Sequence, residues 1–162
     1  MAECNLRVGT GIDIHPFASG RKLFIGGVEI QHSQGLAGHS DADVLLHSLT
    51  DAILGALGWG DIGQWFPNTD EKFRDKDSLF FLKAVWERAA AEGWSLVNCD
   101  NMILAEAPKM APHIPAMRRN IADVLGAAPE RIGIKATTTE QLGFVGRGEG
   151  MAAQSVVLLQ QG

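Results

Sequence analysis

The sequence predicts an α+β fold, with helices on one face of a mixed sheet of about four to five strands. Stretches rich in β-branched residues stand near both ends of the chain, and three amphipathic stretches stand between them. The 162 residues suffice for one hydrophobic core, so we expect a single domain over residues 1–162. The other sheet face would stay open, and the apolar stretch 154–159 indicates that self-association buries it.

Strands are predicted where β-branched and apolar residues lie between turn-forming residues. In residues 5–15, glycines separate the β-branched residues, which is typical of a strand that approaches a ligand or another backbone. Pro16 predicts the end of this strand. Residues 22–30, broken by two glycines, predict a second strand with a bulge or hairpin turn, followed by a loop over 31–38. Further strands are expected at residues 94–105 and 131–135, and from Glu149 or Met151 to Gln160.

Helices are predicted in the middle of the chain. Residues 44–57 carry apolar side chains at four-residue spacing, and Ser40 or Asp41 can cap the first turn. The same reasoning predicts helices over residues 77–92, with Asp77 or Ser78 as the cap, and over residues 113–125. Each is followed by a glycine that favours termination.

The composition excludes some classes of partner. The sequence holds 14 Lys and Arg against 19 Asp and Glu, a net charge of −5, which argues against nucleic acid. A small anion could still be held by local cations, backbone amides or a metal. No apolar run approaches the roughly 18 residues needed to span a bilayer, so we expect no membrane association.

The two cysteines, Cys4 and Cys99, are too few for a disulfide framework, and we expect both to be structural. The first five residues lack the basic start and apolar segment of a signal peptide. The low cysteine count and the lack of signal-peptide features together predict a cytoplasmic protein.

Three residues have the chemistry of a metal site. Asp13 and His15 are two apart in a predicted strand, so their side chains share one face, and His47 lies in a predicted helix. Two imidazoles and one carboxylate suit zinc, manganese or a related divalent ion, with one coordination position left open. The alternative is that Asp13 caps a turn and both histidines are ordinary. Asp51, one turn after His47, could orient its ring or be an exposed helix acid.

Two polar segments could bind phosphate. His39 and Ser40 stand at a predicted helix start, where amides and the helix dipole favour an anion, although a cap alone also explains Ser40. Residues 137–140, three threonines and Glu140, follow a strand. Their hydroxyls could hold phosphate oxygens and Glu140 a magnesium ion, or the run could reflect only β-propensity and a helix cap.

The remaining candidates lie in predicted loops. Asp61 and Gly63 belong to a long loop over residues 60–70, where Asp61 is a turn former or an acceptor for hydroxyl groups. Lys109 and Arg147 are the cations best placed for phosphate or a nucleotide, although either could be solvated.

Six segments, in order and over almost the whole chain, together resemble the 2-C-methyl-D-erythritol 2,4-cyclodiphosphate synthase family of the non-mevalonate isoprenoid pathway. They read GIDIHPF at 11–17, AGHSDADVLLHSLTDA at 37–52, GDIG at 60–63, FPNTD at 66–70, APKM at 107–110 and KATTTEQLGFVGRGEG at 135–150. The family often has Asp where this chain has Asn68, a departure that removes no metal ligand.

The resemblance implies a homotrimer with active sites at the subunit interfaces. It implies zinc, or manganese or cobalt, at Asp13, His15 and His47, and magnesium or manganese bridging the diphosphate through Glu140. The implied reaction converts 4-diphosphocytidyl-2-C-methyl-D-erythritol 2-phosphate to the cyclodiphosphate with release of CMP. His39 and Thr138 would stabilise the transition state.

The resemblance also implies the substrate contacts. Asp61 and Gly63 would hold the erythritol part, residues 66–70 would form a flap, and residues 105–111 with 137–140 would wrap cytidine and phosphates from the neighbouring subunit. The implied contact residues are Asp13, His15, His39, Ser40, Asp61, Ile62, Gly63, Phe66, Pro67, Asn68, Thr69, Asp70, Ala105, Glu106, Ala107, Pro108, Lys109, Met110, Ala111, Thr137, Thr138, Thr139, Glu140, Phe144 and Arg147.

The implied chemistry agrees with the residue types. A phosphate monoester that attacks a phosphorus atom is already an anion, so no Ser-His pair or catalytic cysteine is needed. Charge neutralisation and alignment are needed, and cations with nearby hydroxyl and imidazole groups supply them. Two alternatives remain at this stage: a metal-dependent phosphohydrolase, and a trimeric module that binds a nucleotide or an isoprenoid phosphate.

Overall fold

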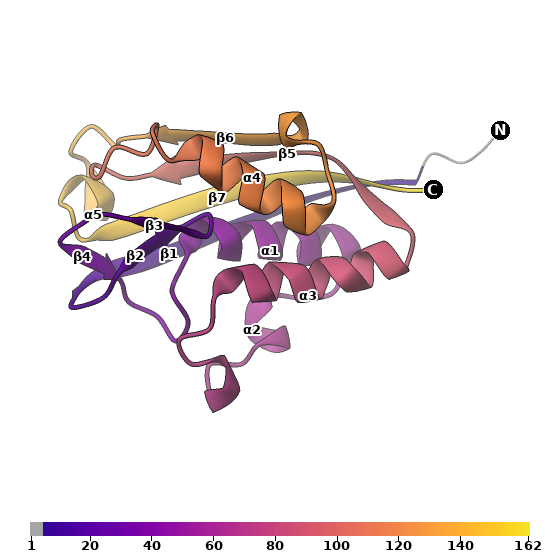
Figure 1. Ribbon diagram of the computed structural model, residues 1–162, viewed down its shortest axis with the longest axis horizontal. Coiled ribbons are helices and arrows are strands. Elements are labelled where there is room, and N and C mark those ends of the chain that lie inside the picture. The colour runs from indigo at the N-terminus through magenta and orange to yellow at the C-terminus, as the bar shows by residue number, and fades with distance from the viewer. Residues whose placement is uncertain (1–4) are drawn as a thin grey trace.

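A five-stranded mixed sheet forms one layer of the protein. The computed structural model describes residues 5–162, so Cys4 lies outside the described residues. The strand order is β4-β1-β7-β5-β6, in which only β5 and β6 run parallel (Figure 1). The strands are β1 (Asn5–Ser19), β4 (Gln34–Leu36), β5 (Trp94–Leu104), β6 (Ile132–Thr137) and β7 (Gly150–Gln161). The predicted mixed sheet is confirmed.

The long helices cover one face of this sheet (Figure 1). They are α1 (Val44–Leu57), α3 (Ser78–Ala91) and α4 (Ile114–Leu125), at the three predicted positions. On β1 the odd-numbered residues from Gly9 onward face the helices, whereas Val8, Ile12 and Ile14 on the opposite face are 69%, 60% and 52% exposed. The second face of the sheet is therefore apolar and open within one chain.

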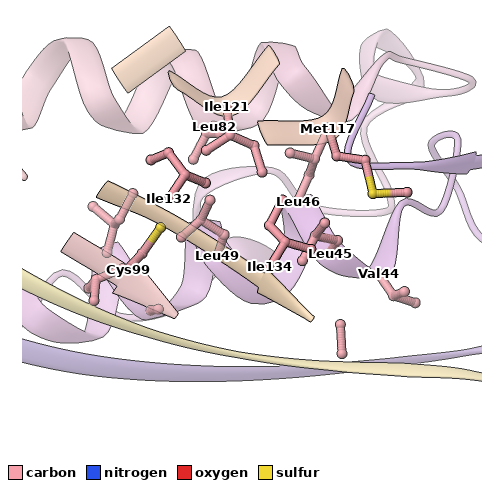
Figure 2. Packing of buried hydrophobic residues seen from close by; sticks show 14 of the residues in the cluster. Val44, Leu45, Leu46, Leu49, Leu82, Cys99, Met117, Ile121, Ile132 and Ile134 are labelled. Carbon is pink, nitrogen blue, oxygen red and sulfur yellow. The ribbon is translucent and has the colours of Figure 1, made fainter. Parts of the chain in front are cut away.

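The core fills the space between α1, the other two helices and the sheet. Figure 2 shows leucines of α1 directed towards residues of α3, α4, β5 and β6. The residues drawn there include Leu45, Leu46, Leu49, Leu82, Cys99, Met117, Ile121, Ile132 and Ile134. Cys99 is buried, as expected of a structural cysteine, and burial raises the pKa of its thiol to about 11. None of the helices within residues 5–162 has the length and hydropathy to cross a membrane.

The first strand is longer than predicted. β1 runs through Pro16 to Ser19, because it changes partner there: Pro16 is its last residue paired with β7, and Phe17 is its first paired with β4. Pro16 needs no N–H at this point, since it contributes its carbonyl, which accepts from Ala37 N at 2.8 Å. Residues 34–36, predicted as loop, are therefore the edge strand β4.

The predicted hairpin is confirmed, and its turn is fastened to α1. β2 (Leu23–Ile25) and β3 (Val28–Ile30) pair around Gly26 and Gly27, both with positive φ.

The cap of α1 is Asp43, not Ser40 or Asp41 as predicted. Its Oδ1 accepts from the backbone N–H groups of the first turn, and its Oδ2 accepts from Gly27 N at 2.8 Å. Burial raises the pKa of Asp43 to about 7.

Two predicted loops contain short helical turns. The loop after α1 holds α2 (Ile62–Trp65) and a 3₁₀ turn, η1 (Glu71–Phe73), and the glycine-rich turn holds α5 (Gly143–Gly146). A second 3₁₀ turn, η2 (Pro129–Arg131), leads into β6. These one-turn elements have no amphipathic period, so the sequence pattern cannot reveal them.

The contact between α1 and β1 requires glycine. A Cβ atom at Gly11 would overlap the carbonyl oxygen of Ser48, and one at Gly9 would overlap that of Ala52. The strand therefore touches the helix backbone directly. This places Asp13 and His15 beside the first turn of α1.

Gly11→Ala tests this contact. We expect the free energy of unfolding to fall by about 1–3 kcal/mol, because the methyl group overpacks the helix–strand contact. The matched control is Gly55→Ala, whose Cβ would meet nothing closer than Thr10 O at 3.7 Å. Gly55 is inside α1, so alanine should raise stability by up to about 1 kcal/mol. Urea unfolding measures both, and equal effects of the two variants would contradict the close contact.

Candidate active site

Asp13, His15 and His47 converge, as the sequence predicts. Asp13 and His15 lie on the helix-facing side of β1, and His47 lies in the first turn of α1. Asp13 Oδ2 lies 3.0 Å from both His15 Nε2 and His47 Nδ1, and the two nitrogens are 3.3 Å apart. Within residues 5–162, this is the one group of three or more potential ligands gathered closely enough to hold a metal ion.

The donor atoms fit a divalent cation. In a tetrahedral zinc site with bonds of about 2.0–2.1 Å, neighbouring donors lie about 3.3 Å apart, close to the separations found here. The three side chains are 13–24% exposed and line a cavity of about 180 Å³. A cation held there would therefore face the cavity with a free coordination position.

Both imidazole rings are oriented by hydrogen bonds on their other nitrogen. His15 Nδ1 donates to Ala37 O at 2.6 Å, which leaves Nε2 as the atom that could bind a metal. His47 Nε2 lies 2.9 Å from Ser78 Oγ and 3.2 Å from Ser40 Oγ. These two serines, and not Asp51, contact the second ring nitrogen of His47. The prediction that Asp51 orients this ring is therefore wrong. Asp51 instead accepts from the backbone N–H of Ile62 at 2.7 Å and so fastens the loop after α1.

The electrostatics of the three residues are coupled. Burial alone would raise the pKa of Asp13, but hydrogen bonds and charge from His15 and His47 outweigh it and hold this pKa below its usual range. Burial alone would lower the pKa of His15, but Asp13 raises it above the ordinary value. The carboxylate therefore stays ionised, and protons compete with a metal at the imidazole.

The same cavity is lined by most of the residues that were predicted to contact the phosphate and erythritol parts of the substrate. Besides the three ligands it is lined by Gly38, His39, Ser40, Ile62, Gly63, Phe66, Asn68, Phe73 and Phe81. His39 Nε2 lies 3.2 Å from the carbonyl oxygen of Asp70, at the end of the predicted flap. Asp61 is exposed at the start of α2, where its side chain accepts from Gln64 N. Pro67 and Thr69 belong to the same flap segment.

A second group of predicted residues lies at the carboxyl ends of the parallel strands β5 and β6. Glu106 Oε1 accepts from the backbone N–H of Thr139 at 2.9 Å, and Thr138 Oγ1 donates to Glu140 at 3.1 Å. Residues 105–111 and 137–140 do not line the cavity of the three ligands. Arg147 pairs with Glu149 at 2.8 Å. One chain thus carries two separate halves of the predicted site.

Some residues that support the site were missed. Ser78 was predicted only as a possible helix cap, and Asp41 only as a cap of α1, yet they meet beside His47. Phe73 and Phe81 line the cavity as well. Their sequence positions mark a helix start and apolar packing, so only the tertiary structure reveals these contacts.

A comparison with protein-family models matches residues 6–160 to the YgbB family. This chain belongs to the YgbB family. A relative from Halalkalibacterium halodurans is 60% identical over 154 residues, 95% of this chain and 98% of its own length. It is named 2-C-methyl-D-erythritol 2,4-cyclodiphosphate synthase.

Two solved structures are similar to this chain over nearly its whole length. The bifunctional IspDF from Campylobacter jejuni superposes with a TM-score of 0.94 at 46% identity, over 99% of this chain and 43% of that protein. IspF from Plasmodium falciparum, solved as a CDP complex, has a TM-score of 0.86 at 31% identity, with 97% of each chain covered. The resemblance seen in the sequence motifs is confirmed.

The raised pKa of His15 predicts how metal affinity depends on pH. Because Asp13 makes the apo protein hold a proton on His15 more tightly than free histidine does, a cation must displace it. Zinc affinity should therefore rise about tenfold per pH unit below the pKa of His15 and level off above it. Chelator competition between about pH 5.5 and 8.5 measures this, and flat affinity would contradict it.

Proposed function

We propose that this protein converts 4-diphosphocytidyl-2-C-methyl-D-erythritol 2-phosphate to 2-C-methyl-D-erythritol 2,4-cyclodiphosphate and releases CMP. The observation that carries the proposal is the Asp13, His15 and His47 group on a cavity, in a chain 60% identical to a named synthase over almost its whole length. The reaction is an intramolecular phosphoryl transfer.

In this reaction the 2-phosphate oxygen attacks the β-phosphorus of the cytidyl diphosphate. One P–O bond forms, and the bond from the β-phosphorus to the bridging oxygen breaks, so that CMP leaves with the electron pair. A divalent cation at Asp13, His15 and His47, and a second one at Glu140, would supply positive charge to the phosphate oxygens. Because the nucleophile is already an anion, no side chain has to remove a proton from it.

The residues around the cavity align the substrate and exclude water. His39 and Ser40 can donate hydrogen bonds to phosphate oxygens beside the cation, and Asp61 with Gly63 can hold the erythritol hydroxyls. Phe66 packs on Phe81 with ring centroids 4.7 Å apart. Through this contact, the first residue of the flap packs against the apolar core side of the cavity. Excluding water matters, because water attack would give a linear product.

The cytidine half of each site would come from a neighbouring subunit. Residues 105–111 and 137–140 lie away from the cation cavity of their own chain, so a second copy must bring them there. The open sheet face can form that contact, because Ile12, Ile14 and Leu142 are 60%, 52% and 73% exposed. They line an apolar hollow of about 530 Å³ together with Phe144. We propose a homotrimer joined through this face, with Thr138 completing the neighbour's site.

Product analysis tests the function. The protein with zinc and magnesium is expected to give a cyclic diphosphate and CMP, observed by phosphorus NMR. His47→Ala should reduce kcat by at least about 100-fold, since it removes a cation ligand. The control is His113→Asn, a histidine at the start of α4 that does not line the cavity.

Other outcomes of the assay would indicate a different function. A linear bisphosphate as the only product would identify a phosphohydrolase. Absence of turnover together with tight nucleotide binding would identify a binding module.

The oligomeric state tests the assembly. The chain mass is 17.4 kDa, and light scattering should give about three times that value. Val8→Asp on the open face should yield monomers that lose turnover but keep zinc affinity, because the three ligands belong to one chain. Ala90→Asp, exposed on α3 in the helix layer, is the control and should stay trimeric. A monomeric wild type with full activity would refute the trimer.

A further inference from the structure

The nearest hydrogen-bond partner of His47 Nε2 belongs to a segment much further along the chain. Ser78 opens α3 and is fully buried, and its Oγ lies 2.9 Å from His47 Nε2. The opposite ring nitrogen, Nδ1, is the one that faces Asp13 and His15. The partner at Nε2 therefore determines whether that nitrogen carries a proton.

Asp41 fixes the direction of that hydrogen bond. Asp41 Oδ1 accepts the hydroxyl hydrogen of Ser78, and Asp41 Oδ2 accepts the backbone N–H of Ser78 at 3.0 Å. Since the single hydrogen of the hydroxyl is engaged, Ser78 Oγ can only accept from His47. His47 then carries a proton on Nε2, so Nδ1 is the nitrogen that can offer its lone pair to a cation.

We propose that Ser78 and Asp41 are positioning residues that hold His47 in the tautomer and ring orientation required of a cation ligand. The inference rests on the cation site of the proposed function and adds the residues that orient His47 Nδ1 towards that site. A ligating histidine whose other nitrogen donates to an anchored acceptor is a stronger ligand and loses less entropy on binding.

Ser40 does not substitute for this pair. Its Oγ is 3.2 Å from His47 Nε2 and accepts from the backbone N–H of Ala42 at 3.2 Å. In contrast to Ser78, no carboxylate within residues 5–162 holds its hydroxyl hydrogen, which can therefore turn towards a phosphate in the cavity. The two serines beside one ring thus have different roles.

The positioning pair also joins the cation ligand to the end of the flap. Asp75 N donates to His39 O at 2.8 Å, and Asp41 N donates to Lys76 O at 3.1 Å. Residues 39–41 and 75–78 therefore run side by side, with His39 and Ser78 in one unit. A movement of the flap end would therefore shift Ser78 and change its hydrogen bond to His47.

The experiment measures zinc affinity by competition with a chromophoric chelator, which requires no substrate. Ser78→Ala should weaken zinc binding by about 10- to 100-fold, the usual effect of removing a partner of a metal ligand. In proton–nitrogen NMR spectra, His47 should lose its Nε2–H tautomer in this variant. Ser78→Thr, which keeps the hydroxyl, should restore at least part of the affinity.

The matched control is Ser48→Ala. Ser48 is also a fully buried serine, next to His47 in the chain, but its hydroxyl contacts Leu45 O and Ser155 Oγ. This variant should lose stability yet bind zinc within about twofold of wild type. Equal losses of zinc affinity in both variants would mean general loosening and would overturn the proposal.

Three further results complete the test. Should Ser78→Ala fail to fold, Asp41→Asn takes its place, with a several-fold weaker zinc affinity at near-normal melting temperature as the supporting result. Folded Ser78→Ala or Asp41→Asn with wild-type zinc affinity and an unchanged tautomer overturns the positioning role alone. His47→Ala with wild-type zinc affinity overturns the cation site itself, and with it the proposed function.

Discussion

The direct packing of α1 on β1 is the constraint on which the site depends. Gly9 and Gly11 bring the strand into contact with the helix backbone, and this contact sets His47 beside Asp13 and His15. Any side chain at these glycines would push the elements apart. The helix is then held at its start by Asp43, which also binds the β2–β3 turn. Backbone packing, not loop conformation, thus fixes the positions of the three proposed cation ligands.

The local parts of this arrangement could be predicted from the sequence, and the tertiary contacts could not. The period of two placed Asp13 and His15 on one face of a strand, and apolar spacing placed His47 on a helix. Nothing along the chain shows that this strand end meets that helix. The full set of motifs resolved this ambiguity only through the family resemblance.

The wrong predictions share a physical cause. Three side chains within four positions, Ser40, Asp41 and Asp43, can all cap a helix, and the choice depends on where the hairpin turn docks. The edge strand β4 has three residues and forms because β1 continues past Pro16. Asp51 has the spacing of a histidine partner, but its contact is set by the returning loop at Ile62. Each outcome is decided by a distant segment.

The division of the chain into two separated halves has a consequence for how the protein matures. All three cation ligands come from β1 and α1, near the beginning of the chain, and they meet inside a single subunit. A newly folded chain can therefore take up its metal before it encounters another copy. The residues that would hold the nucleotide come later, at the ends of β5 and β6. In the proposed homotrimer, metal loading would thus be a property of the individual chain, whereas turnover would need the assembly.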